Sequence, residues 1–327
     1  MNETARLAAH DGCAVVSPVS DRRPAALFVG LGIAATLALG VALGTARPVA
    51  RLAEVWRGPV GPFEIPVPVE PTPGETDGPT RVRLAGAAEL YALFVERGFR
   101  LDSARRGADA VPRVIVERLP RDLAALDSAD MRKAVFIKAL LPLLLLENER
   151  ILAERQRLER ILAVPAPLGV EDRLFLEDLA DRYEVSSERP RELLRRVDAI
   201  PVSLAIAQAA LETGWGTSKP AQAGHALFGQ MVYRDEDDDG RVRRFADLPG
   251  AVQAYALNLN THRAYAEFRR ARALARAEGK MPDGHVLAQH LQRYSERKMD
   301  YVRDVRAVMR ANGLRALDGA RLDAEPS

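Results

Sequence analysis

A lone carboxylate beside a tryptophan is the first feature with chemical potential. The stretch ALETGWGTS (209–217) places Glu212 three residues before Trp215, and glycines bracket the indole. The carboxyl end of a helix carries partial negative charge, and an adjacent indole excludes water. Both effects favour the neutral acid, so we expect a raised pKa for Glu212. A carboxyl group that stays protonated near neutral pH can act as a general acid on a leaving-group oxygen.

The segment before this carboxylate is small and apolar nearly all round. PVSLAIAQAALE (201–212) predicts a buried helix that begins at Pro201 and ends near Gly214. Gln208 lies one turn before Glu212, where it could orient the acid by hydrogen bonding. The same pattern also fits a surface glutamate at a helix end beside an anchoring tryptophan.

A glycosidase usually pairs its acid with a second carboxylate, or positions water with another polar group. The candidates for this second carboxylate lie in an acidic turn inside FGQMVYRDEDDDGRVRRF (228–245), which has the signature of a β-hairpin closed by Asp-Gly. Its carboxylates are Asp235, Glu236, Asp237, Asp238 and Asp239. The cluster also resembles the first half of a calcium loop, but Ala246 occupies the position of the closing Glu. A plain solvated turn is the third interpretation.

Aromatic side chains near this region could stack on sugar rings or line the site. They are Trp215, Phe228, Tyr233, Tyr294 and Tyr301. The histidines His225 and His262 lack a metal-ligand pattern such as H-E-x-x-H, and no serine or cysteine lies in a recognisable nucleophile motif. We therefore expect no metal and no cofactor.

Composition bounds the class of protein. The chain has 327 residues, of which 47% are hydrophobic and 28% charged, a balance that suits globular domains. The formal net charge is +2, and no basic patch is interleaved with aromatics, so nucleic acid is not an expected partner. Cys13 stands alone, which excludes an intramolecular disulfide and leaves the compartment open.

The amino-terminal region predicts a membrane location. An uncharged run at 24–46 follows Arg22 and Arg23 and is long enough to span a bilayer. This predicts a cytoplasmic tail (1–23), a single-pass anchor in the inner, cytoplasmic membrane and a domain that faces the periplasm. The small residues at 44–46 also fit a cleaved signal peptide.

The rest of the chain divides into a linker and a helical domain. Residues 47–84 form a proline-rich linker, 85–315 the domain and 316–327 a tail. A long helix is expected from after Asp127-Ser128 to about Ala163, with a kink at Pro142 and an apolar face that packs on the domain's own core or on a second copy. Further helices are expected within 87–99, 171–185, 189–200, 247–262, 264–279 and 282–313. The arginines of 269–276 are expected on a solvated face.

Three stretches occur in an order that resembles a known family. They are AQAALETGWGTSKPAQAGHALFGQ (207–230), FADLPGAVQAYALNLNTHRAYAEFR (245–269) and YSERKMDYVRDVRAVMRAN (294–312). They resemble the Bax-like branch of the bacterial glucosaminidases (glycoside hydrolase family 73), which are peptidoglycan hydrolases with a lysozyme-like helical fold. The resemblance covers roughly residues 125 to 312.

The resemblance implies a role for several residues. Glu212 matches the acid of the family's E-[ST]-G-W-G motif, and the second acid of related enzymes maps onto the hairpin, at Glu236 or its neighbours Asp235 and Asp237. Tyr294 matches the family tyrosine near the carboxyl end. His225 stands where the family often has Asn, which leaves the polar contact at that position open. The expected substrate-binding side chains are Gln208, Trp215, His225, Phe228 and Tyr301.

These expectations combine into one hypothesis. The fold class is mainly α, a lysozyme-like helical domain with one short β-hairpin, preceded by a single transmembrane helix and a proline-rich linker. The expected activity is that of an endo-β-N-acetylglucosaminidase, which cleaves the β-1,4 bond after N-acetylglucosamine in peptidoglycan glycan strands. The alternatives are a muramidase or lytic transglycosylase on the same fold, and a glycan-binding envelope protein without turnover.

Overall fold

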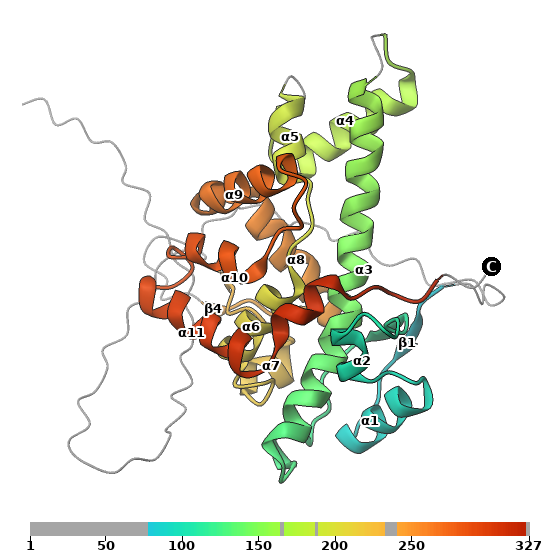
Figure 1. Ribbon diagram of the computed structural model, residues 1–327, viewed down its shortest axis with the longest axis vertical. Coiled ribbons are helices and arrows are strands. Elements are labelled where there is room, and N and C mark those ends of the chain that lie inside the picture. Colours follow the sequence, from blue (N-terminus) through green and yellow to red (C-terminus); the bar gives the residue numbers. More distant parts are fainter. Residues whose placement is uncertain (1–77, 164–166, 187–188, 233–240, 325–327) are drawn as a thin grey trace, which may run out of the picture.

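One long helix organises the molecule. The computed structural model describes residues 78–163, 167–186, 189–232 and 241–324. Helix α3 (Ala129–Ala163) runs through the full height of the fold, with the other elements on its sides (Figure 1). The Ser128 hydroxyl accepts a hydrogen bond from the Met131 N–H at 3.2 Å, which satisfies one free donor of the first turn. The expected long helix is thus confirmed, and it continues through Pro142.

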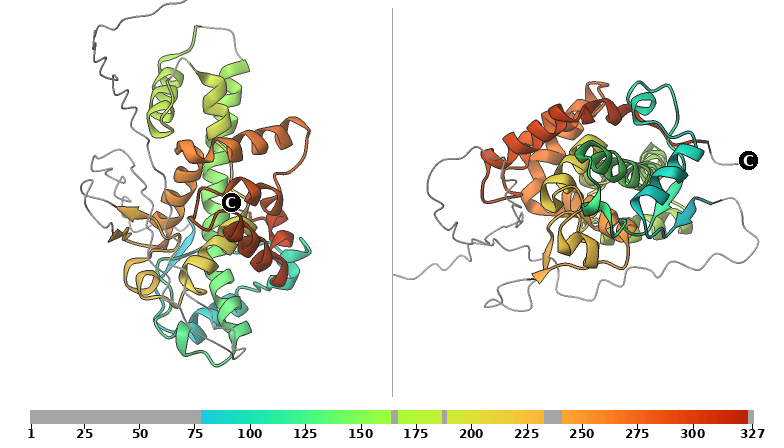
Figure 2. Two further views of the ribbon diagram at one scale, coloured as in Figure 1. Left: turned by 90° about the vertical axis from the view of Figure 1, so that its left-hand side faces the viewer. Right: turned by 90° about the horizontal axis from the view of Figure 1, so that it is seen from below.

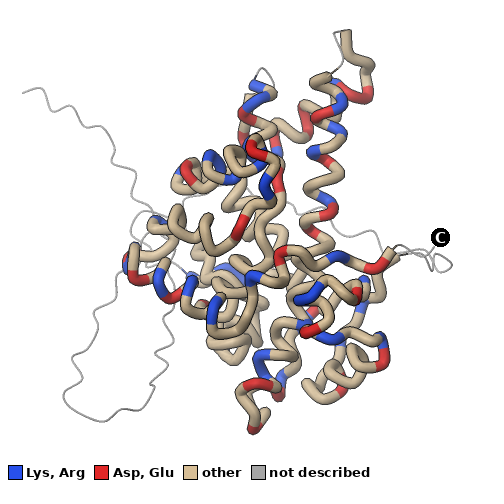
Figure 3. The backbone as a smooth tube through the Cα atoms, in the orientation of Figure 1, with Lys and Arg blue, Asp and Glu red and all other residues tan. Residues whose placement is uncertain are grey.

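Helix α3 changes character along its length. Its middle part, residues 135–145, is buried throughout, while the second half alternates acidic and basic residues on its outer side (Figure 3). Leu144, Ile151 and Leu158 are nevertheless buried within this chain. The apolar face therefore packs on the domain's own core, which was the first of the two expected outcomes.

Helix α6 (Val202–Thr213) is the central buried helix, as expected. All of its residues except Leu211 are buried. It packs against α3, and also against α11 (Met299–Ala311), α10 (Gly284–Leu287) and the 3-10 helix η4 (Leu314–Gly319). A helix surrounded in this way must be apolar on every side, which explains its run of small residues.

The amino-terminal elements cover the other side of α3 (Figure 2). They contain a parallel strand pair, in which Thr80 lies opposite Val114. The strand β1 falls within the stretch that the sequence assigns to the linker. The elements of this part are β1 (Thr80–Val82), α1 (Ala87–Glu96), α2 (Leu101–Arg105), β2 (Val114–Val116) and η1 (Leu123–Ala125).

The remaining helices complete the fold around α6. Helix α8 (Leu248–Thr261) begins as expected, because the Asp247 carboxylate accepts a hydrogen bond from the Gly250 N–H at 2.8 Å. Helices α4 and α5 lie at the upper end of α3 (Figure 1). The elements of this part are α4 (Val170–Arg182), α5 (Pro190–Arg196), α7 (Lys219–Gly224), η2 (Arg263–Tyr265), α9 (Ala266–Ala277) and η3 (Ala288–His290).

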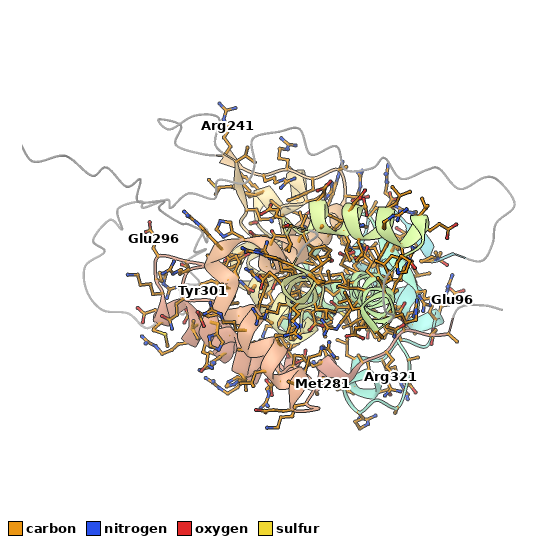
Figure 4. The ribbon with its side chains drawn as sticks, turned by 90° about the horizontal axis from the view of Figure 1, so that it is seen from above. Glu96, Arg241, Met281, Glu296, Tyr301 and Arg321 are labelled. Atoms are coloured by element: carbon orange, nitrogen blue, oxygen red, sulfur yellow. The ribbon has the colours of Figure 1, made fainter. Side chains whose placement is uncertain are left out.

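The expected hairpin is present at its paired ends. Strands β3 (Met231–Val232) and β4 (Arg241–Val242) are antiparallel, with Met231 opposite Val242. Arg241 projects away from the body of the molecule (Figure 4). The turn at 233–240, which carries Asp235, Glu236 and Asp237, lies outside the described residues.

The expected fold class needs two corrections. The described residues hold a parallel strand pair as well as the hairpin, because β1 and β2 meet across 34 positions of sequence that no local pattern links. Within the same residues, no helix is long and apolar enough to cross a membrane. The longest, α3, contains the apolar run 139–146, but charged residues follow it at once. The run 24–46 lies outside the described part of the chain.

The arginines of α9 are a further correction. Arg269 is 3% exposed and Arg272 is fully buried, so this face is not solvated. The Arg272 guanidinium donates to the carbonyl oxygens of Arg195 and Asp198 at 3.1 and 3.0 Å. These carbonyls lie in the last turn of α5 and just after it, where no helical N–H is available to them. The arginine therefore satisfies the carboxyl end of another helix, a relationship that the sequence of α9 alone does not reveal.

Candidate active site

Glu212 occupies the last turn of α6 and is 5% exposed. Its Oε1 atom accepts a hydrogen bond from the Tyr301 hydroxyl at 3.1 Å, whereas Oε2 is buried without a partner among the described residues. Burial raises the pKa of Glu212 to about 8, against the opposing effect of the Tyr301 hydrogen bond. The direction agrees with the sequence-based expectation. A carboxyl group of this kind is mostly protonated at neutral pH.

The turn after Glu212 is tightly wound. Gly214, Trp215 and Gly216 have φ angles of 56°, 61° and 81° in succession. A Cβ atom on Gly216 would lie 2.8 Å from side-chain atoms of Leu119 and Phe136, so only glycine fits there. A left-handed conformation is unfavourable for tryptophan by roughly 1–2 kcal/mol. Strain of this kind is common at functional sites and persists where surrounding packing enforces it.

The packing that enforces the turn comes from α3. The Trp215 ring meets Phe136 edge-on at 5.8 Å between centroids, and the Lys133 ammonium lies 5.5 Å from the indole centroid. The side chain is 9% exposed. Trp215 therefore anchors the loop after Glu212 on α3. Its expected contact with substrate stays a prediction.

A chain of three hydrogen bonds leads to Glu212. The Tyr255 hydroxyl donates to Gln208 Oε1 at 2.8 Å, Gln208 Nε2 donates to the Tyr301 oxygen at 2.9 Å, and Tyr301 donates to Glu212. Gln208 is fully buried. It acts on the acid through Tyr301, and both ends of its amide are occupied by tyrosines. The structure thus places Gln208 behind the acid, a position different from the expected one against substrate.

Four tyrosines surround the acid. The Tyr301 ring, labelled on α11 in Figure 4, stacks on that of Tyr294 at 5.5 Å between centroids, and Tyr265 lies 6.0 Å from Tyr294. Burial raises the pKa of all three, and the negative charge of Glu212 contributes to each shift. The electrostatic coupling places these three phenols near the carboxyl group. The fourth, Tyr255, is linked to the acid only through Gln208 and Tyr301.

Tyr294 and Phe228 support the site from within. The Tyr294 hydroxyl donates to the Phe228 carbonyl oxygen at 2.8 Å, and the Phe228 ring stacks on Tyr255 at 3.9 Å between centroids. Both side chains are almost fully buried. The structure thus places Tyr294 and Phe228, which the sequence predicted as site residues, near Glu212. The Tyr294 hydroxyl is hydrogen-bonded to the backbone.

Two amide oxygens near this cluster lack protein partners within the described ranges. They are Gln230 Oε1 and Asn258 Oδ1, both on buried residues. Gln230 donates to the Ala254 carbonyl oxygen of α8 at 3.2 Å, and a hydrogen bond from Asn258 opposes the rise in the pKa of Tyr265. A buried acceptor without a donor is costly, so such atoms are ready to receive N–H or O–H groups.

Sequence reasoning missed Tyr255, Tyr265 and Asn258. A signal was available, because Tyr255 and Asn258 are three residues apart and therefore lie on one face of α8. That face is otherwise apolar and buried, so two polar groups on it indicate a partner inside the fold.

His225 belongs to a different neighbourhood. It ends α7 in a left-handed conformation, with φ at 51°. Its half-buried ring has a lowered pKa because of burial and the positive charge of Arg118. Its Nδ1 atom is buried and has no partner in the described part of the chain. Its expected role in binding substrate stays a prediction, as do the roles of the hairpin carboxylates.

Comparison with known proteins gives independent evidence of the family to which the chain belongs. The glucosaminidase family, described as mannosyl-glycoprotein endo-beta-N-acetylglucosaminidase, matches residues 189–314, a range that contains Glu212 and all four tyrosines. Protein bax of Escherichia coli (strain K12) is 35% identical over 191 residues, which cover 55% of this chain and 69% of that protein. No solved structure matches. The chain therefore belongs to the Bax-like, glucosaminidase-domain family of glycan-cleaving hydrolases.

Proposed function

We propose that this protein is a peptidoglycan hydrolase that cleaves the β-1,4 bond after N-acetylglucosamine, with Glu212 as general acid. The observation that carries the proposal is the state of Glu212, whose carboxyl group is buried, has one oxygen without a partner among the described residues and has a pKa of about 8. A protonated acid is what cleavage of a glycosidic bond needs at the leaving oxygen. Because peptidoglycan lies outside the cytoplasm, we place the site of action in the periplasm.

The two oxygens of Glu212 have different tasks in this mechanism. Oε1 accepts from Tyr301, so the acidic proton resides on Oε2, which has no partner among the described residues. As the glycosidic bond breaks, the proton passes from Oε2 to the leaving oxygen, and the negative charge stays on the carboxylate. The Tyr301 hydroxyl then stabilises that charge by the hydrogen bond that it already makes.

A second group must stabilise the positive charge on the sugar or position water. We propose that a carboxylate of the hairpin turn does so, with Glu236, Asp235 and Asp237 as candidates. The support comes from the base of the hairpin. Strand β3 begins directly after Gln230, whose side chain is hydrogen-bonded to α8, the helix that carries Tyr255.

Recognition of the sugar follows from the unpartnered amide oxygens. Gln230 Oε1 and Asn258 Oδ1 are acceptors without donors among the described residues. The N–H of a 2-acetamido group and the sugar hydroxyls are donors of matching chemistry. Tyr294 would help to position Gln230, because its hydroxyl is hydrogen-bonded to the backbone at Phe228, two residues before Gln230.

Digestion of purified peptidoglycan tests the proposal. The protein, its Glu212→Gln variant and a Glu177→Gln control on the exposed side of α4 would be incubated with peptidoglycan. The products would be reduced with borohydride and identified by mass spectrometry. Reduced N-acetylglucosamine at the new ends is expected with the wild type and the control only.

Three other outcomes contradict the proposal in different ways. Reduced or anhydro N-acetylmuramic acid at the new ends would show cleavage of the other bond, as in a muramidase or a lytic transglycosylase. Binding to glycan strands without any new ends would indicate a binding protein. Wild-type turnover by Glu212→Gln would remove the acid from the mechanism, since general acid catalysis contributes roughly 10²–10⁴-fold.

A further inference from the structure

We infer that Tyr255 and Gln208 are positioning residues that set the direction of the hydrogen-bond chain to Glu212, and so keep the acid's proton on the oxygen that has no hydrogen-bond partner among the described residues. The inference rests on the proposed role of Glu212 as general acid. Neither residue touches the reacting atoms in this scheme. Each acts through Tyr301.

The direction of the chain begins at Tyr255. This side chain is fully buried, with its ring stacked on Phe228. A buried hydroxyl needs an acceptor for its hydrogen, because a donor left unpaired away from water is costly. Gln208 Oε1 is that acceptor, at 2.8 Å. Tyr255 therefore holds the carbonyl end of the Gln208 amide and turns the NH₂ end toward Tyr301.

The second step fixes the hydroxyl of Tyr301. Its oxygen receives an N–H from Gln208 at 2.9 Å, so its own hydrogen must point elsewhere. Glu212 Oε1 accepts that hydrogen at 3.1 Å. An oxygen that accepts from a phenol is not the one that carries the acid's proton in the same arrangement. The proton is consequently on Oε2, which has no hydrogen-bond partner among the described residues.

The reversed chain would misdirect the proton. If the Gln208 amide were turned over, its carbonyl oxygen would face Tyr301 and would accept the Tyr301 hydrogen. The free lone pair of Tyr301 would then accept the proton of Glu212, which would point into the protein. This reversed chain deprives Tyr255 of the Gln208 acceptor at 2.8 Å. Tyr255 is thus the group that disfavours the unproductive direction.

The charged and titratable surroundings do not supply another fixed charge. Among the described residues, the groups coupled to Glu212 are the phenols of Tyr265, Tyr294 and Tyr301, which come from η2, the segment after η3 and α11. Burial raises the pKa of each phenol, so all three stay neutral in the working range. The orientation of neutral hydrogen bonds therefore decides where the proton lies.

The variant Tyr255→Phe tests the inference without touching Glu212. It retains the ring on Phe228 and removes only the hydrogen that holds the Gln208 carbonyl. We expect kcat on peptidoglycan to fall about fivefold, the equivalent of about 1 kcal/mol, with KM unchanged. The basic limb of the pH–rate profile should move to higher pH, because the reversed chain withdraws the Tyr301 hydrogen bond that lowers the pKa of Glu212.

A second variant removes the donor that fixes Tyr301. In Gln208→Leu no N–H reaches the Tyr301 oxygen, whose lone pair can then accept the proton of Glu212. We expect turnover to fall at least as far as in Tyr255→Phe, about fivefold or more. If this variant does not fold, Tyr255→Phe still decides the question.

The matched control is Tyr183→Phe. Tyr183 is also a buried tyrosine, and its hydroxyl donates to Glu154 at 3.3 Å, away from the site. The Tyr183→Phe variant should lower the melting temperature and leave both kcat and the basic limb at wild-type values. If Tyr255→Phe likewise lowers the melting temperature but leaves kcat and the basic limb unchanged, Tyr255 has a structural role only. That result overturns the inference.

The Glu212→Gln variant distinguishes failure of the proposed function from failure of the inference about Tyr255 and Gln208. If it loses turnover while Tyr255→Phe and Gln208→Leu keep the wild-type rate and limb, the proposed function stands and the inference fails. If Glu212→Gln itself turns over at the wild-type rate, the proposed function fails and the inference fails with it.

Discussion

The stability of a Glu212→Gln variant relative to the wild type should rise with pH. The pKa of Glu212 is about 8 in the folded protein and 4.5 in the reference state. As the pH rises between these values, the unfolded chain releases its proton and the folded protein retains it. Wild-type stability is therefore lost across this range, and the loss is complete above about pH 8. Glutamine cannot ionise, so the variant avoids the loss.

The size of this stability difference follows from the difference between the folded and unfolded pKa values of Glu212. A difference of about 3.5 between the two pKa values corresponds to about 5 kcal/mol in the free energy of unfolding above pH 8, as an upper limit. At pH 7 the same relation gives about 3 kcal/mol. The amide N–H that replaces the Oε2 hydroxyl would be buried without a partner among the described residues, which subtracts roughly 1–3 kcal/mol at every pH. The pH dependence, which this subtraction leaves unchanged, is the quantity to measure.

Urea unfolding of the two proteins at about pH 5, 6.5 and 8 measures that quantity. Between the first and last of these values the stability of Glu212→Gln relative to the wild type should increase by about 3 kcal/mol. The control Glu177→Gln, at an exposed position of α4, should run parallel to the wild type. A constant difference between Glu212→Gln and the wild type across this range would show that the carboxyl group is not held neutral by burial.

Further substitutions test other parts of the structure. Arg272→Met should destabilise the fold by roughly 3–5 kcal/mol in thermal or urea unfolding, because several backbone carbonyls lose their donor and Asp198 an ion pair, whereas Arg270→Met on the exposed face of α9 should change stability by less than about 0.5 kcal/mol. Trp215→Ala should cost roughly 3–5 kcal/mol and reduce turnover, and a wild-type Tm and rate would show that the turn does not depend on α3. Single amide substitutions within 235–237 should each cost less turnover than Glu212→Gln, since neighbouring carboxylates can replace one another; an equal loss at one position would identify the assisting acid.

The elements that local sequence patterns determine were predicted well. The limits of α3, the cap of α8 at Asp247 and the end of α6 at Gly214 all follow from residues within a turn of the boundary. The parallel pair of β1 and β2 was missed because its partners are 34 residues apart. The buried arginines of α9 were misplaced for the same reason. The carbonyls that Arg272 satisfies belong to the end of α5 and the connection to α6, and those that Arg269 satisfies belong to Leu259 of α8 and to His262.

The candidate site shows the same limit on a smaller scale. The sequence makes Glu212, Tyr294 and Tyr301 candidate site residues, but the pairing of Glu212 with Tyr301 spans 89 residues and no local pattern indicates it. Gln208 was expected to orient the acid directly, and the structure instead inserts Tyr301 between them. One-dimensional spacing gives the direction in which a side chain leaves its helix. It does not give which side chain of a distant helix meets it there.

Two buried carboxylates of this chain show why partners decide the chemistry. Burial raises the pKa of Asp198 as it does that of Glu212, but Arg272, Arg276 and Arg155 surround Asp198, and the result is a lowered pKa. Asp198 is thus an ionised structural group, and α9 supplies most of the charge that keeps it so. No cation is paired with Glu212 in the described part of the chain, where Tyr301 is its hydrogen-bond partner. The same degree of burial therefore yields an ion pair at one position and a neutral acid at the other. The difference lies in the arginines of α9 and α3, which pair with Asp198, whereas Glu212 is left among tyrosines.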